Sequence, residues 1–212
     1  MIVVKSITKS MVYFDGEGRD YLQQTVDLVV NRLREGDIRH VAVFTAEGEG
    51  AELLRNALAG DTAIQIFAAT FPPGQKIVKR EPGGNKKDIE TLVSMPEKIN
   101  KLEADGVCVI AGGMPFQEII VPGTNDFRIQ TIIWTLGLIS EGLHLGVQAV
   151  LMACDCGKLA AGEKVIAMSA DTAVVVQSST SRLMFHPRDG IRIHEFLCKP
   201  MYQKGNGAEP QQ

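Results

Sequence analysis

The stretch of sequence that decides the fold is RHVAVFTAEGEGAELLRNALA, residues 39–59. Its first part, residues 39–45, is rich in valine and ends on phenylalanine and threonine, which is typical of a short buried strand. Residues 49–59 contain good helix formers with leucines at helical spacing, and Gly60 follows as a helix stop. A buried strand that leads directly into a helix predicts an α/β fold.

Strands and helices alternate on both sides of this unit. The pattern predicts helices at residues 21–34, 94–104, 126–141 and 145–156, and strands at 63–69, 106–113, 164–170, 171–178 and 191–198. Prolines, glycines and basic residues crowd residues 70–90, so we expect no core element there. The alternation predicts a three-layer α/β/α architecture with a mainly parallel sheet, and the late strands without a helix between them predict a mixed edge. We expect a single domain over residues 1–200 and a disordered polar tail at 201–212.

The composition excludes several classes of protein. The chain has 212 residues and a net charge of -3, which disfavours a dedicated nucleic-acid binder. Hydrophobic residues make up 45% and charged residues 22%, as in a globular rather than a disordered protein. The sequence contains no run of about 18 apolar residues, so no membrane span is predicted. The start, MIVVKSITKS, lacks the apolar stretch of a signal peptide. The 4 cysteines suit a reducing compartment, so we expect a cytoplasmic protein that binds neither membrane nor nucleic acid.

The loop between the predicted strand and helix, Thr45-Ala46-Glu47-Gly48-Glu49-Gly50-Ala51, is the first candidate site. Free backbone N–H groups and the helix dipole favour an anion at a helix N-terminus, and Gly48 and Gly50 let the backbone approach a phosphate. Glu47 and Glu49 would repel a phosphate unless they point away. The alternative is a simple tight turn in which Glu49 only stabilises the start of the helix.

Known nucleotide motifs do not fit this loop. The Walker pattern is absent because no Gly-Lys-Ser/Thr follows, and Gly48-x-Gly50 reaches Leu53 where GxGxxG needs a glycine. The next predicted strand ends in Ala68-Ala69-Thr70 without an acid to hold a ribose, which argues against NAD.

Other segments could complete a crevice at the same edge of the sheet. Gly112 and Gly113 end a predicted strand, Thr124 lies in the turn Pro122-Gly123-Thr124-Asn125, and Asp171 and Thr172 lie between two late strands. Thr124 and Asn125 are also ordinary helix caps. The basic, glycine-rich segment 76–87 could close over a phosphate, or it could be a solvated surface loop.

The cysteines and histidines predict no metal site. Cys154 and Cys156 lie two residues apart on a predicted helix, so they face different directions and lack the CxxC spacing. His194 and Glu195 are neighbours on a predicted strand and point to opposite faces. His144 is predicted to lie in a loop between two helices.

The order of these elements resembles the C-terminal α/β domain of pyruvate kinase. That domain carries a strand, a Thr-x-Ser-Gly-x-Ser/Thr-Ala turn and a helix, and residues 45–51 stand in the position of the turn. Over roughly residues 12–200 the chain is similar to a stand-alone family of prokaryotic, largely archaeal, proteins with this fold. The matching segments are VYF (12–14), VAVFTAEGEGAELL (41–54), GVCVIAGG (106–113), TLGLISEGLHLGVQAVLMACDCGKL (135–159), EKVIAMSADTAVVVQ (163–177) and IRIHEFLCKP (191–200). The resemblance implies a pyruvate kinase C-terminal domain-like fold.

For function, the resemblance implies a phosphate-bearing ligand. Pyruvate kinase activity is not implied, because its catalytic barrel alone needs about 250 residues. In pyruvate kinases the turn can hold a sugar-phosphate effector, and the stand-alone family has been seen with bound FMN. By position, Thr45, Gly48, Gly50 and Ala51 would receive the phosphate.

The chain departs from the family within this turn. Glu47 stands where the family usually has serine, and Gly50 replaces serine or threonine. Two hydroxyl donors to a phosphate are therefore lost, although the backbone N–H donors remain. The segment 70–90 is also longer and more basic than the resemblance implies, and it could supply the missing positive contacts.

The first hypothesis is a protein that binds a phosphorylated small molecule, with FMN as the specific candidate, at residues 45–51, 112–113 and 171–172. If the protein is an enzyme, the flavin carries the redox chemistry. The alternative is a non-catalytic regulatory or assembly module that self-associates through the apolar helices at 126–156 into a homo-oligomer and binds a phosphorylated effector. A third hypothesis is a metal-dependent hydrolase that uses His186, His194 and either Cys154 or Cys156.

Overall fold

The computed structural model describes residues 6–59, 61–75, 77–80, 86–89, 91–117 and 127–201. Its helices are α1 (Leu22–Leu33), α2 (Glu49–Ala57), α3 (Pro96–Ala104), α4 (Phe127–Gly137) and α5 (Glu141–Asp155). The main strands are β1 (Val12–Phe14), β2 (His40–Phe44), β3 (Gln65–Thr70), β6 (Val107–Ala111), β7 (Lys164–Met168), β8 (Ala173–Gln177) and β9 (Arg192–Pro200). Two short strands, β4 (Ile77–Arg80) and β5 (Lys86–Ile89), pair in a separate antiparallel sheet.

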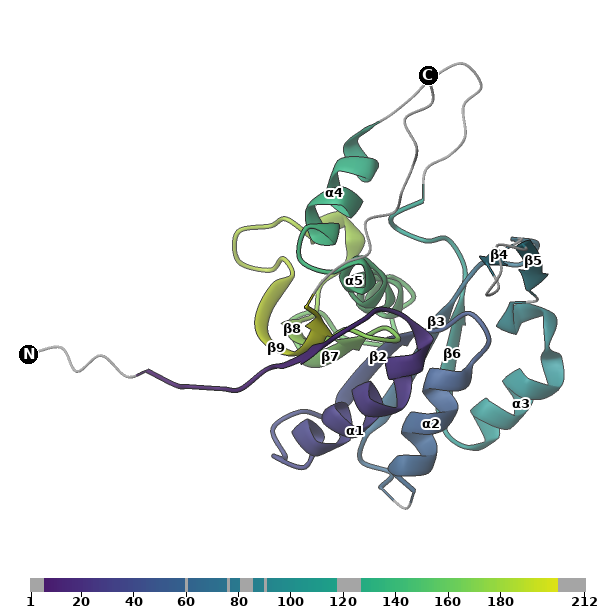
Figure 1. The fold of residues 1–212 in the computed structure, drawn as a ribbon, viewed down its shortest axis with the longest axis horizontal. Helices are drawn as coiled ribbons and strands as arrows, with labels where there is room; N and C mark the ends of the chain where they lie inside the picture. The colour runs from purple at the N-terminus through teal and green to yellow at the C-terminus, as the bar shows by residue number, and fades with distance from the viewer. Residues whose placement is uncertain are drawn as a thin grey trace, which may run out of the picture.

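The main strands form one sheet in the order β1-β9-β8-β7-β2-β3-β6 (Figure 1). β8 runs antiparallel to both of its neighbours, and every other pairing that the structure describes in this sheet is parallel. All strands except β8 therefore bring their carboxyl ends to one edge of the sheet. The predicted α/β fold with a mainly parallel, partly mixed sheet is confirmed.

Helices cover both faces of the sheet, which produces two hydrophobic cores (Figure 1). β2 contributes side chains to both cores, because successive side chains of a strand point to opposite faces of the sheet. Val41 and Val43 belong to the core beneath α1 and α2, whereas Ala42 and Phe44 belong to the core beneath α5. A strand buried on both faces has a continuous apolar sequence, which is why residues 39–45 could be predicted as a buried strand.

The apolar stretch between residues 126 and 156 folds as two helices with a sharp corner between them. α4 ends at Gly137, and α5 begins after Ser140, whose backbone is extended. His144 therefore lies inside α5, and the predicted loop at this residue is wrong. Among the described residues, no single helix is long and apolar enough to span a bilayer; α4 and α5 reach that length only as a pair, which is bent by 119°.

Three short strands of the structure, β1, β4 and β5, were not predicted. β1 has three residues and pairs in parallel with β9, and so short a strand has no periodic pattern to detect. β4 and β5 lie within the segment 70–90, where we expected no core element, and they form their own small sheet. The tail predicted to be disordered falls, apart from Met201, outside the described residues.

A network around a buried arginine links α1, β7, β9 and the loop after α1 at the opposite edge of the sheet. Arg32 of α1 donates through Nε to Glu195 Oε2 of β9 at 2.9 Å and through Nη1 to Asp37 Oδ1 at 2.6 Å. Lys164 of β7 donates to Asp37 Oδ2 at 2.8 Å. The hydrogen bonds from Arg32 and Lys164 hold the pKa of the Asp37 carboxyl well below its usual range.

Replacement of Arg32 by methionine is expected to lower the free energy of unfolding by about 2 kcal/mol at pH 7, because the largely buried Glu195 loses its 2.9 Å partner and keeps only the longer ion pair to Lys9, at 3.8 Å. The pKa of Asp37 is depressed in the folded state, so its contribution is complete above about pH 4 and is lost as the pH falls below that value. The difference in the free energy of unfolding between wild type and variant, measured by urea unfolding, should therefore become smaller below about pH 4. Arg34→Met, at an exposed arginine of the same helix end, is the control; an equal loss in both variants would contradict the role of the network.

Candidate functional site

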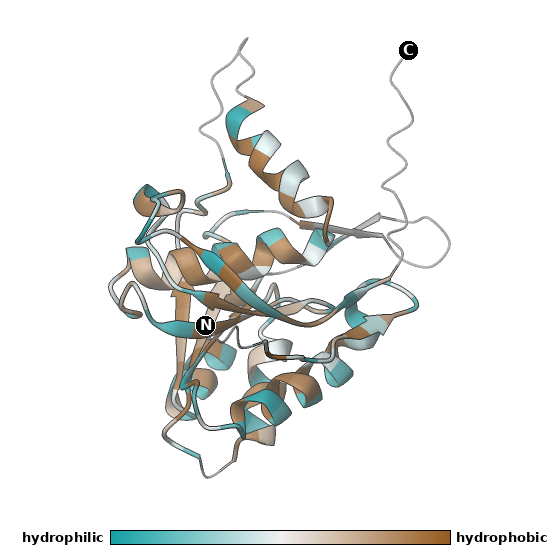
Figure 2. Cartoon of the chain, turned by 90° about the vertical axis from the view of Figure 1, so that its left-hand side faces the viewer, coloured by the Kyte–Doolittle hydropathy of each residue, from teal (hydrophilic) through white to brown (hydrophobic). Residues whose placement is uncertain are grey.

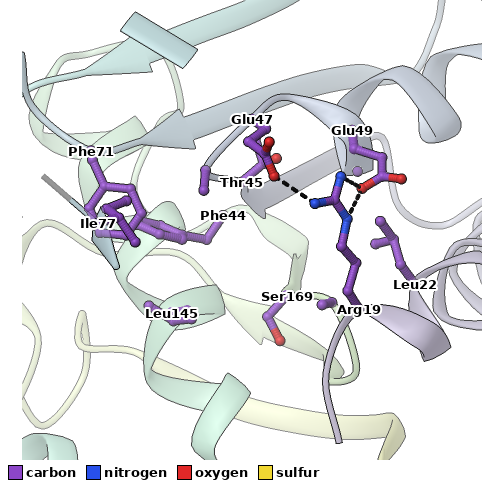
Figure 3. Close-up of a pocket in the computed structure, with 13 residues that line it drawn as sticks. Arg19, Leu22, Phe44, Thr45, Glu47, Glu49, Phe71, Ile77, Leu145 and Ser169 are labelled. Atoms are coloured by element: carbon purple, nitrogen blue, oxygen red, sulfur yellow. Dashed lines mark hydrogen bonds and ion pairs between the residues drawn. The ribbon is translucent and has the colours of Figure 1, made fainter. Parts of the chain in front are cut away.

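The candidate site lies where the topology of the sheet changes direction. β2 and β7 are parallel neighbours, but the chain leaves β2 through α2 towards β3, whereas it leaves β7 through a tight turn into β8 on the other side. The two connections diverge, and ligands of open α/β sheets bind in the crevice beyond such a point. A pocket with a volume of about 270 Å³ opens there (Figure 3). Its lining residues are Arg19, Leu22, Phe44, Thr45, Ala46, Glu47, Glu49, Gly50, Phe71, Ile77, Leu145, Ser169 and Ala170.

Arg19 and two glutamates form the polar end of the pocket (Figure 3). Arg19 lies in the 3-10 turn before α1 and reaches across to the loop after β2, where its Nη1 donates to Glu47 Oε2 at 2.6 Å and its Nε donates to Glu49. Burial would lower the pKa of this guanidinium, but the hydrogen bonds to Glu49 and Glu47 outweigh burial and raise it. One positive charge thus meets two negative charges, and these three side chains supply no excess positive charge.

The loop after β2 turns sharply into α2. The Gly48 N–H donates to Thr45 Oγ1 at 2.9 Å, and Gly48 has a φ of 86°, which favours glycine. A Cβ on Gly48 would lie 3.1 Å from the Lys98 side chain, so this position faces α3. Glu49 and Gly50, in the first turn of α2, line the pocket. The N–H groups of a first turn have no acceptor within the helix, so they are donors for an anion bound there.

Aromatic and aliphatic side chains form the other end of the pocket. Phe44 ends β2, Phe71 follows β3, Ile77 begins β4 and Leu145 belongs to α5. The rings of Phe44 and Phe71 meet edge to face, with centroids 5.0 Å apart and planes at 85°. Figure 3 shows these side chains across the pocket from Arg19. The pocket therefore suits a ligand with an apolar part and a polar part.

Asp171 and Thr172, two of the predicted site residues, form a buried polar cluster beside the pocket. The Gly18 N–H donates to Asp171 Oδ2 at 2.6 Å, and Thr172 Oγ1 donates to Asp171 Oδ1 at 2.9 Å. The Ser140 hydroxyl, at the N-cap of α5, lies 2.6 Å from Thr172 Oγ1. Because Gly18 immediately precedes Arg19, Asp171 fixes the turn that carries Arg19 to the pocket.

The structure brings together part of the predicted site. The predicted residues that line the pocket are Thr45, Glu47 and Gly50. Gly48 packs towards α3, and Ala51 is buried in the core beneath α1 and α2. Gly112 and Gly113 follow β6, two strands away from β2, and do not line the pocket. Thr124 lies outside the described residues.

The basic segment 76–87 contributes one described side chain to the pocket, Ile77. The backbone of residues 77–80 and 86–87 belongs to the β4–β5 sheet. The side chains of its lysines and arginine lie outside the described part of the structure, so the closure of this segment over a phosphate stays a prediction.

The cysteines and histidines are dispersed over the fold. Within the described ranges, no group of three His, Cys, Asp or Glu side chains could hold a metal ion. His194 is exposed on β9, while the neighbouring Glu195 accepts from Arg32. Burial raises the pKa of the Cys154 thiol to about 11, which keeps it protonated and weakly nucleophilic at neutral pH.

Sequence reasoning missed several lining residues, namely Arg19, Phe71, Ile77, Leu145 and Ser169. Phe71 and Ser169 directly follow β3 and β7, so the rule that ligands bind beyond the carboxyl ends of parallel strands could have found them. Arg19 lies in a turn without periodicity. Ile77 and Leu145 reach the pocket only through the packing of β4 and α5, which no local pattern encodes.

No protein-family model matches this chain. Among solved structures, it is similar to a pyruvate kinase from Cryptosporidium parvum, with a TM-score of 0.34 and 12% identity over 74% of this chain and 22% of the pyruvate kinase. The pyruvate kinase of this organism in complex with ADP gives a TM-score of 0.34 and 10% identity over 82% of this chain and 23% of that one. The chain thus spans less than a quarter of these pyruvate kinases. The likeness is weak, and the α/β fold is defined by the sheet and helices of this chain itself.

Proposed function

We propose that this chain binds a small molecule composed of a flat apolar ring and a phosphate group, with FMN as the member of this class to test first. The observation that carries the proposal is the division of the pocket into an aromatic end and an end with Arg19 and the first turn of α2. The sequence resemblance described above implies the same class of ligand.

The apolar end suits the ring of such a ligand. A ring placed against Phe44 and Phe71 would exchange water for aromatic contact, and Ile77 and Leu145 add aliphatic surface. The volume of about 270 Å³ lies just below the range of about 300–1,000 Å³ for small-molecule sites. A ligand of the size of FMN would therefore be enclosed at its ring and remain partly in solvent.

The polar end supplies donors for the phosphate. These are the guanidinium of Arg19 and the backbone N–H groups of Glu49 and Gly50 at the start of α2. The phosphate has to compete with Glu47 and Glu49 for Arg19. Since all three side chains are partly exposed, their ion pairs are worth only about 0–1 kcal/mol, and Arg19 can exchange partners at low cost.

Flavin fluorescence provides the test. FMN added to the protein should show saturable quenching, and Phe71→Ala should weaken FMN binding about tenfold, or about 1.4 kcal/mol, because half of the aromatic wall is removed. Phe185→Ala is the matched control, since Phe185 is 73% exposed and lies outside the pocket. Its affinity for FMN should equal that of wild type.

Two outcomes would overturn the proposal. Absence of quenching up to about 1 mM FMN, which corresponds to a binding free energy weaker than about 4 kcal/mol, would remove flavin as the ligand. Equal losses of affinity in Phe71→Ala and Phe185→Ala would show that the binding is not at this pocket.

A further inference from the structure

Helix α4 has two apolar sides, and only one of them packs against the rest of the described chain. The packed side consists of Ile129, Ile132, Ile133 and Leu136, which contact the core beneath α5. On the other side Phe127, Trp134 and Leu138 are 60%, 58% and 85% exposed. Figure 1 shows α4 beyond α5, away from the sheet, and Figure 2 shows hydrophobic residues recurring along its length.

The exposed residues form one stripe along the helix. Phe127, Thr131, Trp134 and Leu138 follow each other at intervals of four, three and four residues, which places them on the same side. The Leu138 N–H donates to the Trp134 carbonyl at 3.0 Å, so the helical course extends to the end of the stripe. This alternating three-and-four spacing is that of a seam along which two helices pack side by side.

The hydroxyl groups along α4 already donate within their own helix. Thr131 Oγ1 donates to the Phe127 carbonyl at 2.6 Å, and the adjacent Thr135 Oγ1 donates to the Thr131 carbonyl at 2.7 Å. These hydroxyls bond within their own helix, so neither water nor a polar partner is needed to satisfy them. The hydroxyls of Thr131 and Thr135 can therefore be buried without being left unpaired, and the indole N–H of Trp134 is then the remaining side-chain donor of the stripe.

The surrounding charge disfavours a membrane as the occupant of this face. Helices that lie on a membrane surface carry several Lys or Arg residues on their polar face. Between Glu103 and Lys158 the sequence contains one basic residue, Arg128. Adsorption of α4 to a membrane would therefore lack the attraction between basic side chains and anionic lipid headgroups.

We propose that α4 forms a homodimer interface, in which this stripe packs antiparallel against the stripe of a second copy. Phe127 and Leu138 lie at equal distances from the middle of the stripe, and so do Thr131 and Trp134. An antiparallel copy therefore sets Phe127 beside the partner's Leu138, and the small Thr131 beside the large ring of the partner's Trp134. Because the stripe itself is uncharged, a two-fold axis brings no like charges of the stripe together.

The dimer should be weak and dependent on concentration. The exposed area of these few side chains is roughly half of the about 800 Å² per partner found in standard interfaces. We therefore expect a dissociation constant on the order of micromolar to tens of micromolar. This inference does not rest on the proposed ligand, since the stripe residues lie outside the pocket.

Analytical ultracentrifugation of the full chain tests the interface. Protein concentrations between about 1 and 200 µM cover the expected dissociation constant of the dimer. Wild type should shift from monomer to dimer, and Trp134→Glu should stay monomeric because it places two carboxylates near the two-fold axis. Phe185→Glu, which changes an even more exposed aromatic residue outside α4, should dimerise like wild type. Adding Thr131→Lys to Trp134→Glu should restore part of the dimer, since each lysine would then face the partner's substituted position 134.

Three results would overturn the inference. They are a wild-type monomer throughout the range, dimerisation of Trp134→Glu equal to that of wild type, and loss of the dimer in Phe185→Glu alone. Circular dichroism of each variant checks that α4 and the rest of the fold persist. Flotation of a monomeric wild type with anionic vesicles would assign the face to a membrane instead.

Discussion

Replacement of Gly142 by alanine is expected to lower the free energy of unfolding by about 3 kcal/mol, a large share of the about 5–15 kcal/mol that stabilises a typical domain. A Cβ on Gly142 would contact Ser169 Oγ and would lie 2.6 Å from Asp171 Oδ1 and 2.8 Å from Thr172 Oγ1. All three oxygens belong to short, buried side chains that have little room to move. The substitution must therefore disrupt the polar cluster at the start of α5.

The expected decrease in the free energy of unfolding is opposite in sign to the usual effect of replacing glycine by alanine in a helix. At an unobstructed helix position, glycine to alanine stabilises by about 0.5–1 kcal/mol, because alanine has the higher helix propensity. Gly137 in α4 is such a position, because a Cβ added there would have nothing within 4 Å. Gly137→Ala is therefore the matched control for urea unfolding. If Gly142→Ala is as stable as this control, the cluster rearranges freely and does not anchor α5.

Most of the fold could be predicted because its central elements are buried on two sides. Residues 41–44 of β2 and 149–154 of α5 are apolar without interruption, and this is visible in the sequence. The start of α5 was misplaced because residues 138–144 (LISEGLH) contain no proline to mark the corner. The corner at Ser140 is instead associated with a hydrogen bond to Thr172, far along the chain. β1 exists only because β9 is available to pair with it.

The position of the pocket in the fold could be predicted from the sequence, but the arrangement of its side chains could not. The rule that ligands bind beyond the carboxyl ends of parallel strands pointed to the loop from Thr45 to Gly50, most of which lines the pocket. The sequence left open whether Glu47 and Glu49 oppose a phosphate or point away. In the structure they turn towards Arg19, which is distant in sequence and held in place by the contact between Gly18 and Asp171. Such a contact has no signature in the local sequence.

Neutralising both glutamates is expected to strengthen the binding of FMN about tenfold, on the basis of the proposed function. In wild type the carboxylates of Glu47 and Glu49 occupy the guanidinium that the phosphate needs, and they repel the phosphate itself. The double variant E47Q/E49Q keeps the size of both side chains and removes both charges. Affinity is measured by the flavin titration at low salt, where partly exposed charges interact most strongly.

Riboflavin separates the phosphate from the ring, because it carries the same ring without the phosphate. Its affinity should be the same in wild type and in E47Q/E49Q. A tenfold gain for both ligands would mean that the glutamates shape the apolar end instead of competing for Arg19. A different result would be equal affinity for riboflavin and FMN, both in wild type and in E47Q/E49Q. That result would support binding of the ring at the apolar end of the pocket and would contradict binding of the phosphate at Arg19.

Arg19→Gln completes the argument, because Arg19 is the group for which the phosphate and the glutamates compete. In wild type its loss should weaken FMN binding only a few-fold, since the glutamates already hold the guanidinium. In the E47Q/E49Q background the same substitution should cost ten- to a hundredfold, or about 1.4–2.8 kcal/mol, because there the guanidinium pairs with the phosphate alone. Residues that act independently would give equal losses in the two backgrounds. A larger loss in the second background would identify Glu47 and Glu49 as internal competitors that set the affinity of the site for anionic ligands.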